Sequence, residues 1–396
     1  MTAATASRHD RPGVAVASLP PERARAADGL PARLTARWVA AEAWPALIEN
    51  WERLARAAAP NVFLNPAFAL AARGIDVGAG LGAVVVEAGD RLVGLAPGRL
   101  RLGGLAFTFW THPYAPLGAP LILAGAEEPV LGAIIDHLRA QGVIALDWPL
   151  MDDGSPLTVA LTGLAAARGL RIDVIEAHQR AALMTAEPPR PSKELRRLSR
   201  RLGEQGRVEA VSTASGFDPE VAKAAFLALE ATGWKGARGT ALAMSEAMRA
   251  FFAGAVGRLM IRGEAEIDLL VMDGRPIAAG VVLRAGTRAW YWKTAYDETL
   301  ARFSPGVLVT HAITARLAAD AQVSCVDSCA IAGHPMIDRV WPARLAVTSR
   351  LVALRPDGGG AAYGMVLAAI RLRLAARDRA KAVLARIRRA RAKAAG

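Results

Sequence analysis

The sequence has little cysteine, which narrows both its compartment and its chemistry. Its 396 residues include only Cys325 and Cys329. Two cysteines four residues apart are too few for a disulfide framework or a cysteine-rich zinc site. We therefore expect the reducing cytoplasm as the compartment, with the chain either in solution or peripheral to the inner membrane.

Long apolar runs are also missing. No run reaches the roughly 20 residues that cross a bilayer, and the opening residues, MTAATASRHD, do not form a cleavable signal peptide. Hydrophobic residues nevertheless make up 53% of the chain and charged residues 21%, which favours a folded protein. At about 150 residues per domain, this length predicts two or three domains.

The signatures of metal and nucleotide chemistry are absent as well. None of the 6 histidines pairs with another at metal-ligand spacing, and the chain has no Gly-x-Ser-x-Gly, Walker or zinc motif. We predict no metal dependence. His311 and His334 are the histidines that can approach a site, and we place His311 among the candidate substrate-binding residues. A structural role is the alternative for each.

Positive charge is abundant but concentrated at one end. The chain has 49 Lys and Arg against 36 Asp and Glu, a net charge of +13. Residues 371–396 alone contain ten basic residues and one acid, Asp378, so this segment carries +9 and the rest of the chain +4. The whole-chain charge therefore gives weak support for a nucleic acid, and the feature to explain is a basic C-terminal helix.

Hydrophobic periodicity predicts that the two halves of the chain repeat one another. DRLVGLAP at 90–97 resembles GRPIAAGV at 274–281, which aligns Arg91 with Arg275, and the segment that ends at Asp147 resembles the one that ends at Asp327. The two offsets, 184 and 180 residues, agree to within four. Duplication of one unit of helices and antiparallel strands is our leading interpretation, and chance similarity of such segments is the alternative.

Composition changes divide the predicted repeats. Three prolines, at 188, 189 and 191, separate the halves, and the run DGGG at 357–360 precedes the basic helix. We predict an α/β protein of the α+β type, in which each unit has a mixed, mostly antiparallel sheet flanked by helices. The predicted segments are a flexible leader (1–33), a first unit (34–188), a second unit (189–356) and a basic helical tail (357–396).

The first candidate site follows a predicted helix that bears Glu230 and stops at Gly233. Trp234, Lys235 and a glycine then occupy a turn that we expect to be exposed. Trp234 can pack flat on a ligand, Lys235 can meet a phosphate or carboxylate, and Glu230 can orient an amine or pair with Lys235. The alternative is a tryptophan folded back into the core beside a solvated lysine.

The second candidate site follows the predicted strand that contains Lys293. There Ser304 has the position of an N-cap, Pro305 that of the first helical residue, and Gly306 leaves the backbone accessible. Unpaired N–H groups and the helix dipole at such a terminus suit a pyrophosphate. The same three residues also begin ordinary helices, which is the alternative.

Taken together, these motifs resemble those of the CelD/BcsL-like acetyltransferases, which belong to the GNAT superfamily and are similar to FemAB-type transferases with two tandem GNAT-like units. The resemblance is strongest over about residues 195–350. The residues that carry it are Glu230, Trp234-Lys235-Gly236, Gly239-Thr240-Ala241-Leu242, Lys293, Tyr296-Asp297-Glu298, Ser304-Pro305-Gly306 and Asp327.

The resemblance implies acyl transfer from acyl-coenzyme A, with acetyl-CoA as the typical co-substrate. Pantetheine would lie along a strand and pyrophosphate at Ser304-Pro305-Gly306, although the usual GNAT loop has more arginine and glycine. Glu230 or Glu298 would act as the base and Tyr296 as the acid, while Lys235 and Lys293 would hold an anionic substrate group. Asp327 is a further catalytic candidate, with capping of the next helix as its alternative role.

We therefore predict an acyltransferase that modifies an amine or hydroxyl of a small molecule or glycan precursor, in exopolysaccharide, cellulose or cell-envelope biosynthesis. One alternative is FemX-like transfer from an aminoacyl-tRNA, and another is a non-catalytic scaffold at a membrane surface. The basic tail suits an anionic membrane, an acidic partner or, as the least favoured partner, a nucleic acid. A solvated tail without a partner is the remaining alternative.

Overall fold

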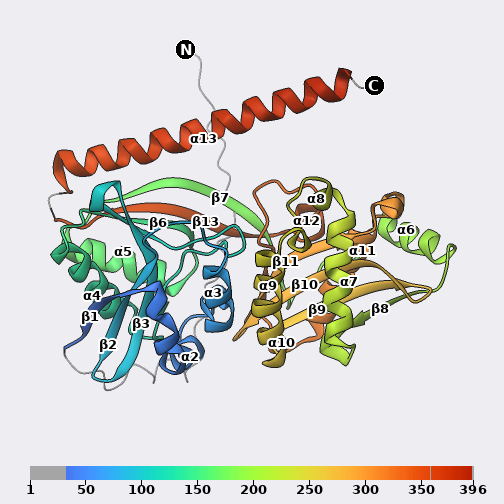
Figure 1. The fold of residues 1–396 in the computed structure, drawn as a ribbon, viewed down its shortest axis with the longest axis horizontal. Helices are drawn as coiled ribbons and strands as arrows, with labels where there is room; N and C mark the ends of the chain where they lie inside the picture. The colour runs from blue at the N-terminus through green and yellow to red at the C-terminus, as the bar shows by residue number, and fades with distance from the viewer. Residues whose placement is uncertain (1–32, 357, 395–396) are drawn as a thin grey trace, which may run out of the picture.

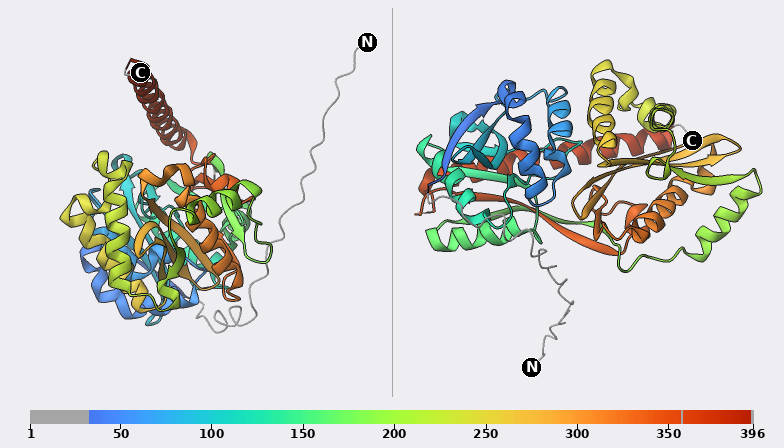
Figure 2. Two further views of the ribbon diagram at one scale, coloured as in Figure 1. Left: turned by 90° about the vertical axis from the view of Figure 1, so that its right-hand side faces the viewer. Right: turned by 90° about the horizontal axis from the view of Figure 1, so that it is seen from below.

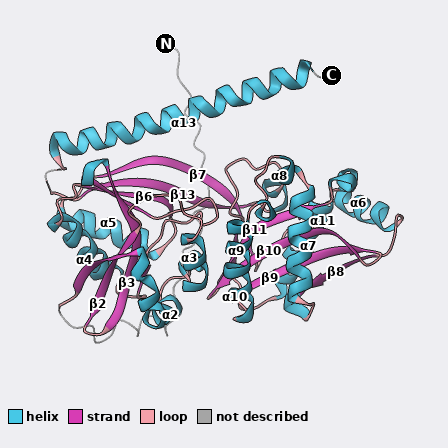
Figure 3. Ribbon diagram, in the orientation of Figure 1, coloured by secondary structure: helices cyan, strands magenta, loops and turns pink. Residues whose placement is uncertain are grey.

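The computed structural model describes residues 33–356 and 358–394 (Figure 1). The predicted leader, residues 1–33, lies outside this part of the chain except for Arg33. Helices cover both faces of one long mixed sheet (Figure 3). Within the described residues, no helix combines the length and the apolar character needed to cross a bilayer.

The first half of the chain begins the sheet at one edge. Its strands are β1 (Thr35–Ala40), β2 (Gly82–Ala88), β3 (Arg91–Arg101), β4 (Ala106–Phe109), β5 (Leu121–Ile122), β6 (Ala145–Asp152) and β7 (Ile172–Met184). Its helices are α2 (Ile48–Ala57), α3 (Pro66–Arg73), α4 (Glu127–Ala140) and α5 (Pro156–Arg168).

The second half builds the other edge. Its strands are β8 (Val208–Ser212), β9 (Ala265–Met272), β10 (Arg275–Ala285), β11 (Arg288–Tyr296), β12 (Cys325–Asp327) and β13 (Ala343–Ala353). Its helices are α6 (Lys193–Gly203), α7 (Pro219–Thr232), α8 (Trp234–Ala237), α9 (Glu246–Phe252), α10 (Arg258–Ile261), the 3-10 helix η8 (Glu298–Phe303), α11 (Pro305–Ala319), α12 (Ile337–Val340) and α13 (Gly360–Ala394).

The two halves share one order of strands, which confirms the predicted tandem fold. In the first half the antiparallel path β1-β2-β3-β4 is followed by a parallel pair, β4 and β6. In the second half β8-β9-β10-β11 is followed by the parallel pair β11 and β12. Arg91 begins β3 and Arg275 begins β10, so the aligned arginines occupy equivalent places in the two hairpins.

The last strand of each half pairs with the other half. Strand β13 lies between β6 and β7, and β7 in turn pairs with β12, so the sheet runs without interruption from β1 to β8. The longest contact is between β13 and β7, which pair over residues 343–352 and 172–182. This exchange joins two repeated units into one body.

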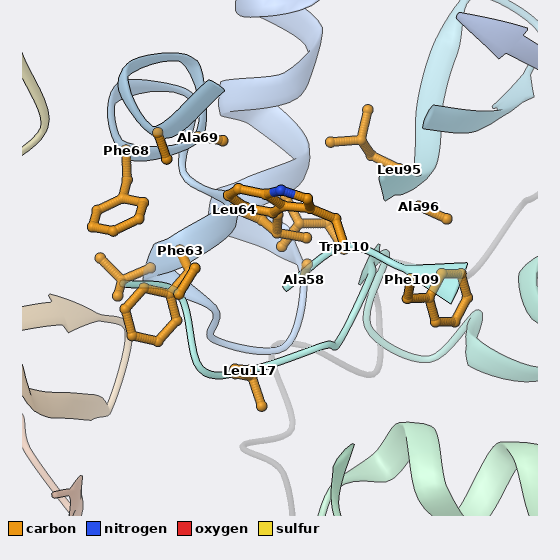
Figure 4. Close-up of a cluster of buried hydrophobic side chains, with 14 of the residues drawn as sticks. Ala58, Phe63, Leu64, Phe68, Ala69, Leu95, Ala96, Phe109, Trp110 and Leu117 are labelled. Atoms are coloured by element: carbon orange, nitrogen blue, oxygen red, sulfur yellow. The ribbon is translucent and has the colours of Figure 1, made fainter. Parts of the chain in front are cut away.

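Side chains fill the opening between β4 and β6 in the first half. Phe109, the last residue of β4, and Trp110 just after it belong to a buried apolar cluster (Figure 4), and the ring of Phe109 meets that of Trp148 edge-on with centroids 4.8 Å apart. The indole N–H of Trp110 donates to Asp76 Oδ2 at 2.7 Å. Because close-packed aromatic rings leave little room for a ligand, this part of the first half is core.

The two faces of the second half carry different helices. Residues of α7 and α9 pack on one face of β9, β10 and β11, while α11 packs on the other (Figure 2). On the first half, α5 covers one face of the sheet and the beginning of α13 covers the other, through Tyr363, Val366, Leu367 and Ile370. The predicted C-terminal helix is thus present and docks by its first turns.

Candidate functional site

A cavity of about 820 Å³ lies where β11 and β12 separate. The two strands pair in parallel at Arg288–Trp290, after which β11 continues to Tyr296 while the chain leaves β12 at Asp327. Residues 291–296 of β11 line one wall, and residues 328–331 and 334–337 line the opposite one. An extended strand whose edge faces a cavity offers backbone N–H and C=O groups to a linear ligand.

The sites predicted from sequence largely converge on this cavity. Among the lining residues are seven candidates: Glu230, Trp234, Lys293, Tyr296, Glu298, Ser304 and Gly306. They come from α7, α8, β11, η8 and the start of α11, elements that span more than seventy residues of sequence. The tertiary fold therefore assembles both predicted motifs into one site.

Glu230 and Lys293 form a buried ion pair in the cavity wall. Lys293 Nζ donates to Glu230 Oε1 at 3.0 Å, and Glu230 Oε2 accepts the backbone N–H of Leu242 at 2.8 Å. The Glu230 side chain is fully buried, whereas that of Lys293 is 10% exposed. Lys293 Nζ also lies 4.6 Å from the centroid of the Tyr114 ring, a cation–π contact.

A bulge in β11 sets the direction of this lysine. Val281 pairs with Lys293 and Val282 with Tyr291, so Trp292 is an extra residue on β11. Such a bulge bends a strand and redirects its side chains, and bulges are common beside active sites. The indole N–H of Trp292 donates to the backbone oxygen of Tyr114 at 2.8 Å, which fixes the first half against the cavity.

Helix α11 begins at the cavity with an unusual N-cap. Ser304 has a φ of 53° and its side chain does not cap the helix, although serine at this position commonly does. Its left-handed backbone points the chain from η8 into α11. A Cβ at Gly306 would come within 2.9 Å of the Tyr296 ring, so only glycine fits between helix and strand. Pro305 is buried as the first helical residue and does not line the cavity.

A hydrogen bond between Glu298 and Trp234 joins η8 to α8 at the edge of the cavity, called the rim below. Glu298 Oε1 accepts the backbone N–H of Trp234 at 2.7 Å and so caps the short helix α8. The Trp234 ring is 49% exposed and carries the Arg238 guanidinium 4.9 Å above its centroid. The expected exposed tryptophan is therefore present, while the side chain of Lys235 lies outside the described part of the structure.

Two predicted residues lie elsewhere. Asp327 is 2% exposed and pairs with Arg180 of β7 at 3.0 Å, and its Oδ1 accepts the backbone N–H of Cys329 at 2.9 Å. Its carboxylate holds the loop that lines the cavity instead of facing the cavity itself. His311 lines a separate hollow between α6, β8 and α11, where burial lowers its pKa.

Several lining residues were not predicted. Tyr114 and its flanking prolines reach the cavity from the first half, because Arg180 holds their loop through bonds of 3.2 Å to the oxygen of Pro116. No local motif marks Tyr114, since its role depends on contact between the halves. Burial beside Asp327 raises the pKa of the Cys329 thiol well above its ordinary value, so this thiol stays neutral at the cavity wall.

His334 also lines the cavity, and its tautomer follows from its contacts. The backbone N–H of Met336 donates to His334 Nδ1 at 3.3 Å. A neutral imidazole with Nδ1 as acceptor carries its proton on Nε2 and acts there as a donor. The sequence predicts that His334 is a histidine that can approach a site, and it does line the cavity. Across the described residues, no group of three or more His, Cys, Asp or Glu side chains is placed to hold a metal ion.

Residues 190–334 match the family model described as an acetyltransferase (GNAT) domain. No curated protein matches the chain. Among solved structures, the chain is similar to the C-terminal domain (DUF2156) of a protein described as a lysylphosphatidylglycerol synthetase from Agrobacterium fabrum, with 13% identity, a TM-score of 0.52, and coverage of 82% of this chain and 96% of that one.

A second similar structure is that of FemX, with 10% identity, a TM-score of 0.51, and coverage of 78% of this chain and 96% of FemX. At these identities the likeness concerns the fold, which agrees with the tandem order of strands. The matched region contains most of the residues that line the cavity, among them those of α7, the bulged strand β11, η8 and the start of α11. Residues 190–334 thus match a GNAT-type acetyltransferase domain, and the chain shares the overall fold of these two structures.

Proposed function

We propose that the chain transfers an acyl group from an acyl-coenzyme A thioester to an amine or hydroxyl acceptor in the cavity between β11 and β12. The observation that carries the proposal is the meeting, in one cavity, of the free edge of β11 and the N-terminus of α11. The strand edge suits the amides of pantetheine, and the helix terminus suits a pyrophosphate. The volume, about 820 Å³, lies within the range usual for small-molecule sites.

The reaction needs a base, an acid and groups that position the substrate, and residues of the cavity can fill these roles. The acceptor attacks the thioester carbonyl carbon, the carbon–sulfur bond breaks, and one proton passes from the acceptor to a base while the leaving thiolate takes one from an acid. We assign the base to Glu298, which lies at the rim with its Oε1 on Trp234, and the acid to the Tyr296 phenol. Both oxygens of Glu230 are already bonded, so its role is to hold Lys293.

Lys293 supplies the positive charge of the cavity wall. Its ammonium group, held between Glu230 and the Tyr114 ring, favours an acceptor with an anionic group. Such an acceptor, either a small molecule or a glycan precursor, is consistent with the proposed CelD/BcsL-like assignment and with a role in exopolysaccharide, cellulose or cell-envelope biosynthesis.

Calorimetric titration with acetyl-CoA, a long-chain acyl-CoA and free coenzyme A tests the proposal. The Gly306→Trp variant should lose binding, because even a Cβ there would come within 2.9 Å of the Tyr296 ring. Gly163→Trp is the matched control, since Gly163 is exposed on α5 with no atom within 4 Å of a built Cβ. Thiol release with candidate acceptors would then identify the reaction.

If the folded parent chain and the folded Gly163→Trp control bind none of the three ligands saturably, the coenzyme A assignment is contradicted. FemX-like transfer from an aminoacyl-tRNA is the second candidate, and helix α6 favours it. Helix α6 carries four arginines, and the Arg201 guanidinium lies 6.0 Å from the ring of Phe303 in η8, the helix that also bears Glu298. Binding of charged tRNA that weakens steeply with salt would support this candidate. If the chain binds neither the coenzyme A compounds nor charged tRNA, the remaining hypothesis is the non-catalytic scaffold at a membrane surface.

A further inference from the structure

Helix α13 has two different apolar faces, and only one of them packs on the protein. Tyr363, Val366, Leu367 and Ile370 are buried against the sheet. Met365, Leu372 and Val383 are 64%, 70% and 53% exposed. Because 18 residues make five full turns of an α-helix, Met365 and Val383 share one side of α13, and Leu372 lies within about 20° of them. This outward stripe faces away from the packed face.

The distal part of α13 has no cover within the described structure. Every residue from 375 to 384 is exposed, and in two views this part of the helix stands clear of the sheet (Figures 1 and 2). Among the described side chains, the last ion pair that ties α13 to the rest of the fold joins Arg377 to Glu176 of β7 at 2.5 Å. A long helix that is bare on all sides gains no stability from tertiary packing.

Charge identifies what fits the stripe. Arg379 and Arg386, seven residues apart, border it on one side and are exposed, and residues 371–396 carry +9 in total. A second copy of this helix would bring an equal positive charge to the stripe, and nucleic-acid phosphates do not cover leucine and valine. A lipid interface meets both needs, because acyl chains take up apolar side chains while anionic headgroups meet the arginines.

We propose that α13 binds the surface of an anionic bilayer, with the side that carries Met365, Leu372 and Val383 inserted at the headgroup boundary. The first turns of α13 fix this helix to β7 and β13, so binding also fixes the orientation of the whole body on the membrane. The inference does not depend on the proposed transfer reaction, because none of these residues lines the cavity.

Co-sedimentation of the full chain with vesicles tests the proposal. The probes are vesicles of phosphatidylcholine alone and vesicles of equal parts phosphatidylcholine and phosphatidylglycerol. The double variant Leu372→Ser/Val383→Ser replaces two of the three apolar side chains of the stripe. The double variant Arg379→Glu/Arg386→Glu reverses the charge of the two residues beside it. Val159→Ser, at a valine that is 66% exposed on α5, is the matched control.

The parent chain and the control should bind the mixed vesicles but not phosphatidylcholine alone, and added salt should weaken that binding. Each double variant should lower the partition coefficient about tenfold or more, while coenzyme A binding stays unchanged. Equal binding to both kinds of vesicle, or parent-like binding by both double variants, would overturn the proposal. So would a dimer without lipid that the serine variant dissociates, since the stripe would then join two copies.

Discussion

Lys293 and Glu230 carry opposite charges in a part of the cavity wall that water barely reaches. The pair is 3.0 Å apart, with the Glu230 side chain fully buried and that of Lys293 10% exposed. Removing charges from water is unfavourable, and a buried pair repays this only while both partners are present. The pair therefore constrains which substitutions the site tolerates, whatever it binds.

We predict that Lys293→Met lowers the free energy of unfolding by about 3–5 kcal/mol, because it leaves the Glu230 carboxylate buried without its cation. The double variant Lys293→Met/Glu230→Gln should recover a large part of that loss, since no charge then remains buried and the glutamine oxygen can still accept the Leu242 N–H. Urea denaturation of both variants measures the difference.

The matched control for this prediction is Arg275→Met. Arg275 pairs with Asp297 at 2.6 Å, but its side chain is 73% exposed, so the loss should stay within about 1 kcal/mol. A double variant less stable than Lys293→Met alone would contradict the account of Glu230 as an uncompensated charge.

For single residues, the sequence predicted a place at the cavity where a residue is unusual within its own segment. An exposed Trp234, a glycine after Pro305 and a lysine in an apolar strand all stand out locally, and all three segments reach the cavity. His311 was predicted to bind substrate, but it does not line the cavity. It shares α11 with Gly306 yet lies five residues further on, about 140° around the helix. Asp327 was predicted as a catalytic candidate, but its carboxylate pairs with Arg180. No local pattern could indicate this pair, because Arg180 belongs to the other half of the chain.

Strands β7 and β13 decide how the two halves hold together. Each is the last strand of its own half, yet β7 pairs with β12 and β13 pairs with β6. Local periodicity predicted the repeated order of elements, because hydrophobic spacing and turns are properties of each segment. It did not predict the exchange, since the choice of partner for an edge strand depends on contacts between segments about 170 residues apart.

We predict that neither half folds alone. A chain ending at 188 lacks β13 and exposes the edge of β6, most of whose residues are buried, while a chain beginning at 189 lacks β7 beside β12. Unpaired edges of this kind promote aggregation. The separate chains should show no cooperative thermal transition, and the two produced together should form a one-to-one complex with one transition.

The complex of the two fragments serves as the control, because it contains every residue and only one broken peptide bond. A cooperative transition in either fragment by itself, followed by circular dichroism, would show that the exchanged strands are not needed for folding. The boundary between residues 188 and 189 would then separate independent domains.

At the scale of the whole molecule, α13 combines a docked segment with an overhanging one. Tyr363 is fully buried, and the single proton of its hydroxyl is shared between Asp173 Oδ2 at 2.8 Å and the Leu351 oxygen at 3.0 Å. Asp173 belongs to β7 and Leu351 to β13, so this one residue fastens the helix to both exchanged strands. Beyond Asp378 the side chains that the structure describes are all exposed.

We therefore predict that ending the chain after Asp378 changes the free energy of unfolding by no more than about 0.5 kcal/mol, because exposed positions contribute little to stability. Tyr363→Ala should lower it by about 3–5 kcal/mol through the lost packing of a buried aromatic ring. Differential scanning calorimetry compares the two, with Tyr363→Phe as the control that keeps the ring and loses only the hydroxyl bonds. A shortened chain as unstable as Tyr363→Ala would mean that the overhang packs on the fold, and its stripe would then be unavailable to a membrane.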